Sequence, residues 1–140
     1  MKTQYKRMVE TRRLYKLEGE LYTKRKFRAI TKQQPELVLK NLAQKIWKQE
    51  GYQKKLPNIR FGKGTTHGTM YYSWCDGETI ELAPKQRDVL TLIHELVHAM
   101  GYDYHDKPFV MKELLLLTKY TEIDQELLFD TFTPVIDLCY

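Results

Sequence analysis

The chain has 140 residues, of which 23 are Lys or Arg, 18 are Asp or Glu and two are Cys. This length suits one domain with a single core, and the lack of an apolar run of about 18 residues excludes a membrane-spanning helix. The first residues lack the hydrophobic stretch of a secretion signal, and Cys75 and Cys139 are too few for a disulfide framework. We therefore expect an intracellular protein, in the cytoplasm, nucleoid or nucleus, with both cysteines as thiols.

Charge is distributed unevenly along the chain. Residues 1–63 carry 18 Lys and Arg against 5 Asp and Glu, whereas residues 64–140 carry 5 against 13. A basic half can bind DNA through phosphate contacts, and residues 22–28 interleave cations with aromatic rings, as nucleic-acid-binding surfaces do. The alternative is a solvated helix face whose cations pair with acidic faces of the same protein. Both interpretations stay open.

Two helices are expected in the first part of the chain. Residues 2–26 predict a basic helix, and residues 35–50 predict a second helix with Pro35 in its first turn and Gly51 as its stop. The residues expected on the buried side of the second helix are Leu37, Leu39, Leu42, Ile46 and Trp47.

From residue 57 the pattern changes to the alternation of strands. The pair Asp76-Gly77 predicts a hairpin turn between strands at residues 71–74 and 79–82. We expect a small antiparallel sheet, in which the strand at residues 68–74 is the candidate edge that binds an extended substrate by adding it as another strand. At least half of its aromatic side chains, Tyr71, Tyr72 and Trp74, are expected in the core.

Residues 88–100 predict the next helix. Apolar residues recur at spacings of three and four, which is typical of a helix that lays one face on a core. Asp88 can cap its start and Gly101 can end it with a positive φ. The residues of the apolar stripe are Val89, Leu90, Ile93, Val97 and Met100.

This helix carries the pattern HExxH as His94, Glu95 and His98. Positions i and i+4 lie one above the other on a helix, so two imidazoles project from one face and can bind zinc. Glu95 would lie beside a zinc-bound water and act as its general base. The pattern predicts a zinc hydrolase, and the alternative is a structural or accidental occurrence.

A catalytic zinc site needs a third protein ligand and an open position for water. His105 is the leading candidate, because it follows His98 by seven residues and lies just beyond the predicted helix stop. Glu113 is the alternative, since many HExxH enzymes take a carboxylate ligand from a following helix.

Other polar residues near the motif have weaker interpretations. Asp103 and Asp106 are expected to cap a helix or to orient an imidazole, and His67 is expected in a solvated loop. Tyr102 and Tyr104 could donate a hydrogen bond to the oxyanion of a tetrahedral intermediate.

Two further helices are predicted at residues 109–120 and 123–132. Residues 114–117 are apolar on almost every side of the first of these helices, which predicts that they are buried. The segment at residues 134–140 is too short to assign.

Residues 92–100, followed by residues 105–109, resemble the SprT-like zinc metalloproteases and their WLM-type relatives. These families place HExxH on a helix and a third histidine in a short His-x-x-x-Phe-like segment. Three upstream segments resemble the short strands that precede the active-site helix in such proteins: residues 57–61, 68–72 and 79–84. The resemblance covers about residues 35–118 and leaves residues 1–34 as a basic N-terminal extension.

The resemblance implies that His94, His98 and His105 are zinc ligands and that Glu95 is the catalytic acid/base. The third histidine comes one residue later than in the metzincin pattern HExxHxxGxxH, so a metzincin assignment is weaker. The zinc ribbon of some SprT-like members is missing, since the chain has only two cysteines.

The sequence therefore predicts an α+β fold, a single zincin-like domain over residues 1–140 with N-terminal helices, a short antiparallel sheet and an HExxH helix. The expected activity is that of a zinc metalloendopeptidase that cleaves protein or peptide substrates. The resemblance links these substrates to DNA-associated proteins. The alternative is a non-catalytic nucleic-acid-binding or interaction protein with a structural zinc site.

Overall fold

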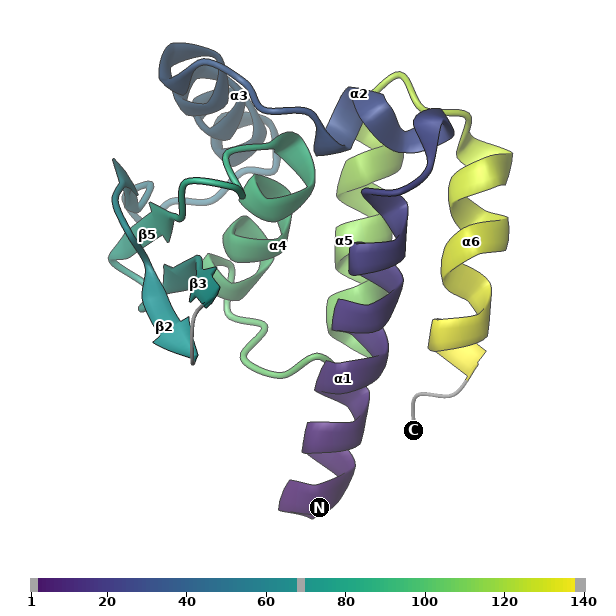
Figure 1. The fold of residues 1–140 in the computed structure, drawn as a ribbon. Coiled ribbons are helices and arrows are strands. Elements are labelled where there is room, and N and C mark those ends of the chain that lie inside the picture. Colours follow the sequence, from purple (N-terminus) through teal and green to yellow (C-terminus); the bar gives the residue numbers. More distant parts are fainter. Residues whose placement is uncertain (1–2, 68–69, 138–140) are drawn as a thin grey trace. The chain divides into compact units, whose positions relative to one another are not determined.

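The computed structural model describes residues 3–67 and 70–137, which form helices and short strands of the expected α+β class (Figure 1). These residues fall into two compact units. The sheet unit comprises residues 32–101, and the helical unit comprises residues 1–31 together with residues 102–140. None of the described helices is both long and apolar enough to span a membrane.

The sheet unit contains a three-stranded sheet, a two-stranded hairpin and two helices. The sheet has the strand order β1-β5-β4, in which β1 is parallel and β4 antiparallel to β5, and β2 and β3 form the separate antiparallel hairpin. Helix α4 packs against α3, β4 and β5. The elements are α3 (Glu36–Gln49), β1 (Asn58–Phe61), β2 (Thr65–His67), β3 (Met70–Tyr72), β4 (Trp74–Cys75), β5 (Thr79–Leu82) and α4 (Val89–Ala99).

The predicted turn at Asp76-Gly77 joins β4 to β5, so the hairpin is confirmed. The Asp76 carboxylate accepts the backbone N–H of Glu78 at 2.9 Å and that of Thr79 at 2.7 Å. The N–H of Thr79 and then that of Glu78 lower the pKa of Asp76, because they favour its charged form. Gly77 has φ +93°, a conformation that glycine adopts without steric cost.

The prediction of an antiparallel sheet is wrong for β1, which runs parallel to β5 with Ile59 opposite Ile80. Parallel neighbours need a long crossover connection. Here residues 62–78 supply it, and they include the β2–β3 hairpin and β4. Alternation along a strand reports which face is buried but not which way the neighbouring strand runs.

The candidate edge strand at residues 68–74 is divided in two at Ser73, and residues 68 and 69 lie outside the described part. The backbone N–H and the hydroxyl of Ser73 both donate to the side-chain oxygen of Gln86 at 2.8 Å. The Ser73 hydroxyl oxygen in turn accepts the N–H of Ala83 at 2.9 Å. The strand therefore ends at Ser73, and the two-residue β4 is an edge of the three-stranded sheet.

The buried carboxylate of Glu81 joins several parts of this unit. It forms an ion pair with Arg60 of β1 at 3.2 Å and accepts the indole N–H of Trp74 at 3.1 Å. It also accepts the backbone N–H of Gly64 at 2.8 Å. Burying a carboxylate is costly unless it is paired and hydrogen-bonded, and Glu81 has partners from β1, β4 and the loop before β2. None of the aromatic side chains of residues 71–74 is fully buried, contrary to the expectation for at least half of them.

The two helices of the sheet unit differ from their predicted burial. Helix α4 is buried on nearly all sides and not only along the predicted stripe, because Leu92 and Leu96 are fully buried as well. In α3 the side chain of Leu37 is 68% exposed, so its predicted burial is wrong. Leu37 belongs to the first turn of α3, and the buried face of this helix consists of Leu39, Ala43, Ile46 and Trp47.

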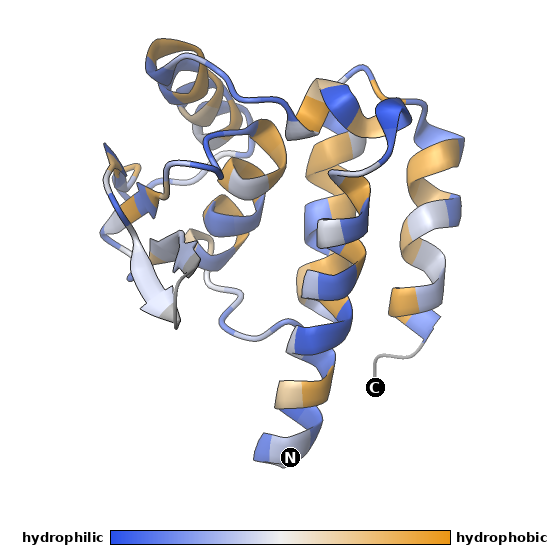
Figure 2. Cartoon of the chain, in the orientation of Figure 1, coloured by the Kyte–Doolittle hydropathy of each residue, from blue (hydrophilic) through white to orange (hydrophobic). Residues whose placement is uncertain are grey.

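The helical unit has a core between long helices. Helix α6 packs against α5 and α1, and Figure 2 shows hydrophobic residues along α5 and α6. The elements are α1 (Gln4–Leu21), the 3-10 turn η1 (Arg25–Phe27), α2 (Arg28–Thr31), α5 (Lys107–Tyr120) and α6 (Gln125–Asp137). The largest fully buried side chains of this unit are Leu14, Leu21, Phe27, Ile30, Phe109 and Phe132.

The N-terminal segment is thus part of a folded core, since Leu14 and Leu21 of α1 are fully buried. In α5 the predicted burial of residues 114–117 is wrong for Leu115, whose side chain is 54% exposed. Helix α6 begins two residues later than predicted and continues through Pro134 to Asp137. Cys139 lies outside the described residues.

Candidate metal centre

The HExxH pattern lies wholly within α4. The Asp88 carboxylate begins this helix by accepting the backbone N–H of Thr91 at 2.8 Å, as expected for an N-cap. Gly101, with φ +106°, follows the C-cap residue Met100 and ends it. Both ends of the helix are therefore set by the local signals that the sequence predicted.

His94 and His98 lie on one face of α4, with ring centroids 5.2 Å apart and ring planes at 67°. A nitrogen of the His94 ring and a nitrogen of the His98 ring lie within 4.8 Å of each other. Two imidazole nitrogens that bind one tetrahedral zinc at about 2.0–2.1 Å are roughly 3.3 Å apart, a separation that falls within the 4.8 Å limit for this pair. His94 is buried and His98 is half-buried, which leaves one side of the pair open to solvent. The pair fits a metal ion.

Glu95 follows His94 and is 6% exposed. Its charge acts on Cys75 of β4, whose pKa is raised to about 11. Burial is the main cause of this rise, and the Glu95 carboxylate adds to it, while the N–H of Gly77 opposes it. The Cys75 thiol is therefore protonated at neutral pH, and the charge of Glu95 acts on a residue of β4.

His105 belongs to the helical unit, where it packs against α1 and α5. Its ring centroid lies 5.1 Å from that of Tyr15 and 4.9 Å from that of Phe109. Its Nδ1 atom lies 3.0 Å from the hydroxyl oxygen of Thr11. Both Thr11 and Tyr15 come from the segment that the sequence assigned to an N-terminal extension, so sequence reasoning missed them.

The residues around His105 have separate roles. Asp106 caps α5 by accepting the N–H of Phe109 at 3.3 Å, which confirms the predicted cap. The Arg7 guanidinium lies 3.7 Å from the centre of the Tyr104 ring, a cation–π contact that attaches the loop before α5 to α1. Asp103 is exposed. The oxyanion roles proposed for Tyr102 and Tyr104 stay predictions.

Glu113, the alternative third ligand, is fully buried in α5. An oxygen of Glu113 and one of Glu18 from α1 lie within 4.8 Å of each other. Sequence reasoning missed Glu18. The signal that could have found it is the spacing of Glu10, Leu14, Glu18 and Leu21, which places two acids on the buried face of an otherwise basic helix.

The described residues thus include several side chains that could hold a metal ion. They are His94 and His98 in the sheet unit and His105, Glu18 and Glu113 in the helical unit. Imidazole nitrogen suits zinc and other transition metals, whereas carboxylate oxygen also suits harder cations. These side chains therefore support a metal ion as the cofactor.

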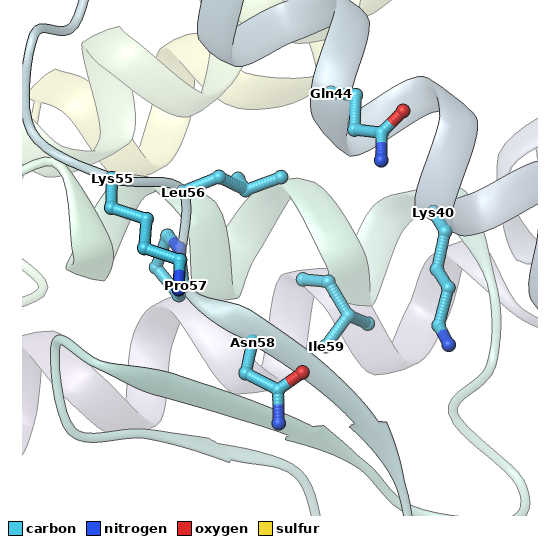
Figure 3. Close-up of a pocket in the computed structure, with 7 residues that line it drawn as sticks. All are labelled: Lys40, Gln44, Lys55, Leu56, Pro57, Asn58 and Ile59. Carbon is cyan, nitrogen blue, oxygen red and sulfur yellow. The ribbon is translucent and has the colours of Figure 1, made fainter.

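A separate hollow of about 480 Å³ lies in the sheet unit between α3 and β1 (Figure 3). It contains none of the candidate metal ligands and is lined by Lys40, Gln44, Lys55, Leu56, Pro57, Asn58 and Ile59.

No protein-family model matches the chain, and neither does any curated protein or solved structure. The motif and its local geometry are therefore the observations from which a function can be argued.

Proposed function

We propose that the protein is a zinc-dependent peptidase of the SprT-like kind. In this proposal His94, His98 and His105 are the zinc ligands and Glu95 is the catalytic acid/base. The observation that carries it is the capped helix α4, which holds two imidazoles with nitrogens within 4.8 Å and a buried carboxylate at the next position.

The proposed chemistry divides between the ion and the protein. When bound, zinc lowers the pKa of a coordinated water to about 7 and polarises the carbonyl of the peptide bond. A carboxylate oxygen of Glu95 takes a proton from the attacking water and delivers it to the nitrogen of the departing amine. Glu95 is 6% exposed, so little bulk water competes for this proton.

The substrate would bind as an extended strand along the sheet unit. Strand β4 is a sheet edge in the described part of the chain and packs against α4. An added strand at β4 would lie beside the helix that carries Glu95, and its backbone would supply affinity independent of sequence. This assignment moves the candidate substrate edge from residues 68–74 to β4.

Binding of DNA is a second proposal, and the charge of α1 supports it. Lys6, Arg12 and Lys16 are exposed on this helix, and the exposed segment that follows contains Lys24, Arg25 and Lys26. Such a face would bring DNA-associated proteins to the peptidase through contacts with phosphates. A non-catalytic protein with a structural zinc site is the alternative, and it would have four protein ligands and no bound water.

The test combines metal content with peptidase activity on an unfolded protein substrate. The wild type is expected to contain about one zinc per chain, and Glu95→Gln to keep the zinc but lose roughly 10²-fold or more in turnover. His98→Ala is expected to lose the metal, and Glu126→Gln, at an exposed position of α6, is the matched control. A wild-type protein without zinc, or equal turnover in Glu95→Gln, would disprove the proposal.

A further inference from the structure

The hydroxyl group of Thr11 lies between two groups of the helical unit. Its oxygen lies 2.9 Å from the backbone carbonyl oxygen of Arg7 and 3.0 Å from Nδ1 of His105. A carbonyl oxygen has no proton to give, so the single hydroxyl hydrogen of Thr11 is donated to Arg7. The contact with His105 must then run the other way, with the N–H at Nδ1 donating to the Thr11 oxygen.

This assignment of hydrogens determines the form of the imidazole ring. A neutral histidine with its hydrogen on Nδ1 carries its lone pair on Nε2, and zinc binds a neutral imidazole through such a lone pair. Metal-binding histidines commonly donate their other ring N–H to an oxygen of the protein, which fixes the tautomer and the ring orientation.

We infer that Thr11 is a positioning residue for His105, which holds the ring in the tautomer that coordinates through Nε2. The inference rests on the proposed function, in which His105 is the third zinc ligand. Two ring contacts also fix the orientation of the imidazole, since Tyr15 and Phe109 pack against it and limit its rotation. Helix α1 supplies both Thr11 and Tyr15, which are four residues apart and so on one face.

The test compares Thr11→Val, which keeps the branched shape but removes the acceptor, with Thr11→Ser, which keeps the hydroxyl. The first measurement is the ¹⁵N chemical shifts of the His105 ring in zinc-free protein, which distinguish the two tautomers. Wild type and Thr11→Ser are expected to carry the hydrogen on Nδ1, and Thr11→Val to shift toward Nε2. The second is zinc affinity by chelator competition, expected to be about 10- to 100-fold weaker in Thr11→Val only.

The outcomes separate this inference from the proposed function. Unchanged tautomer and zinc affinity in Thr11→Val overturn the role of Thr11, while zinc binding by the wild type leaves the peptidase proposal standing. A wild-type protein that binds no zinc overturns the proposed function and with it the ligand role of His105. Circular dichroism shows whether Thr11→Val is folded, and rescue by Thr11→Ser excludes a general effect of substitution at this position.

The hollow between α3 and β1 carries a second and independent inference (Figure 3). Two cations, Lys40 and Lys55, line it together with the aliphatic residues Leu56, Pro57 and Ile59. In the described part of the chain neither lysine forms an ion pair with a carboxylate, although Lys40 lies 5.6 Å from the centre of the Phe61 ring. The hollow is therefore basic at its rim and apolar between the cations.

The backbone groups of β1 alternate between the edge that pairs with β5 and the opposite edge. The N–H of Asn58 donates to the carbonyl of Glu78, toward β5. Successive residues of a strand direct their backbone groups to opposite edges, so those of Ile59 point away from β5. Among the described strands β1 is an edge of its sheet, and such an edge accepts an added strand.

We propose that this hollow binds an extended acidic peptide segment, whose backbone pairs with β1 and whose carboxylates meet Lys40 and Lys55. The lining favours a peptide over a nucleic acid, because it offers aliphatic side chains for an apolar residue and no aromatic ring on which a base could stack.

Fluorescence anisotropy with a labelled peptide of alternating Glu and Leu tests this site. The double variant Lys40→Glu with Lys55→Glu is expected to bind at least about 10-fold more weakly than wild type, as for loss of close charge pairs. Lys45→Glu with Lys48→Glu is the matched control, because both lysines are exposed on α3 outside the lining. The same peptide with methylated backbone nitrogens is expected to bind weakly. The proposal would be overturned if the two double variants bound the peptide equally well. It would also be overturned if Lys40→Glu with Lys55→Glu weakened binding to a DNA oligonucleotide but not to the peptide.

Discussion

Nδ1 of His105 lies 3.0 Å from the hydroxyl oxygen of Thr11, a residue 94 positions earlier in the chain. This contact joins α1 to the segment that follows the HExxH helix in sequence. Residues 1–34, which the family resemblance leaves out, therefore contribute directly to the surroundings of a candidate zinc ligand.

The N-terminal helix is predicted to be a structural part of the domain. Leu14→Ala removes a fully buried side chain of α1 and is expected to lower the free energy of unfolding by about 2–5 kcal/mol. Tyr5→Ala, at a 69% exposed position of the same helix, is expected to change it by less than about 0.5 kcal/mol. Urea denaturation measures both, and similar midpoints for the two variants would mean that α1 does not contribute to the core.

The third ligand is predicted to be His105 and not Glu113. Loss of a residue that only supports a ligand weakens zinc binding by up to roughly 100-fold. His105→Ala removes a ligand itself and is expected to weaken zinc binding by more than this. Glu113→Gln keeps the size of this buried side chain and is expected to keep the zinc. Chelator competition on both variants decides between them, and the reverse order of affinities would assign the ligand to Glu113.

The thiol of Cys75 is predicted to react slowly. With its pKa raised to about 11 by burial and secondarily by the Glu95 charge, alkylation by iodoacetamide at pH 8 is expected to be about 100-fold slower than for a thiol of ordinary pKa. The rate is expected to rise until about pH 11. A Cys139→Ser background leaves Cys75 as the single thiol of the chain, and the same protein unfolded in urea is the control.

The same shift has a consequence for stability. The folded chain holds the Cys75 proton more tightly than the unfolded chain, whose thiol has a pKa near 9.0. The resulting contribution to the free energy of unfolding is present below pH 9 and is lost as pH rises toward about 11. An alkylation rate that levels off near pH 9 in the folded protein would contradict both expectations.

Two glycines are predicted to respond in opposite ways to alanine. Gly64 has φ +76°, and a Cβ there would meet the carbonyl oxygen of Tyr72, so Gly64→Ala is expected to cost at least about 1–2 kcal/mol. Gly19 lies within α1 with no atom near its missing Cβ, and Gly19→Ala is expected to stabilise by about 0.5–1 kcal/mol. Thermal unfolding measures both, and a stabilised Gly64→Ala would refute the close packing of this loop.

The sequence predicted those features that depend on neighbouring residues. Asp88 and Gly101 bound α4 because a side-chain cap and a positive φ act within one helical turn. The turn at Asp76-Gly77 was found for the same reason. The HExxH pattern places His94 and His98 on one face through helical spacing alone.

The features that the sequence did not reveal depend on distant residues. The direction of β1 is set by the crossover through residues 62–78, and nothing within β1 encodes it. Thr11 and Glu18 acquire their partners only when α1 packs in the helical unit, so a pattern read along a basic helix gives them no special meaning. Leu37 looks like a core residue by type, yet the first turn of α3 leaves it exposed.

The division of the strand at Ser73 has a consequence for engineering. Because Ser73 is bonded to Gln86 and Ala83, the start of β4 is held by contacts outside the β2–β3 hairpin. Strands β2 and β3 are therefore candidate segments for exchange, provided that the close approach of Gly64 to the carbonyl oxygen of Tyr72 is kept. Sequences of other lengths could be grafted there to bind chosen targets, while the β4–β5 hairpin keeps its register.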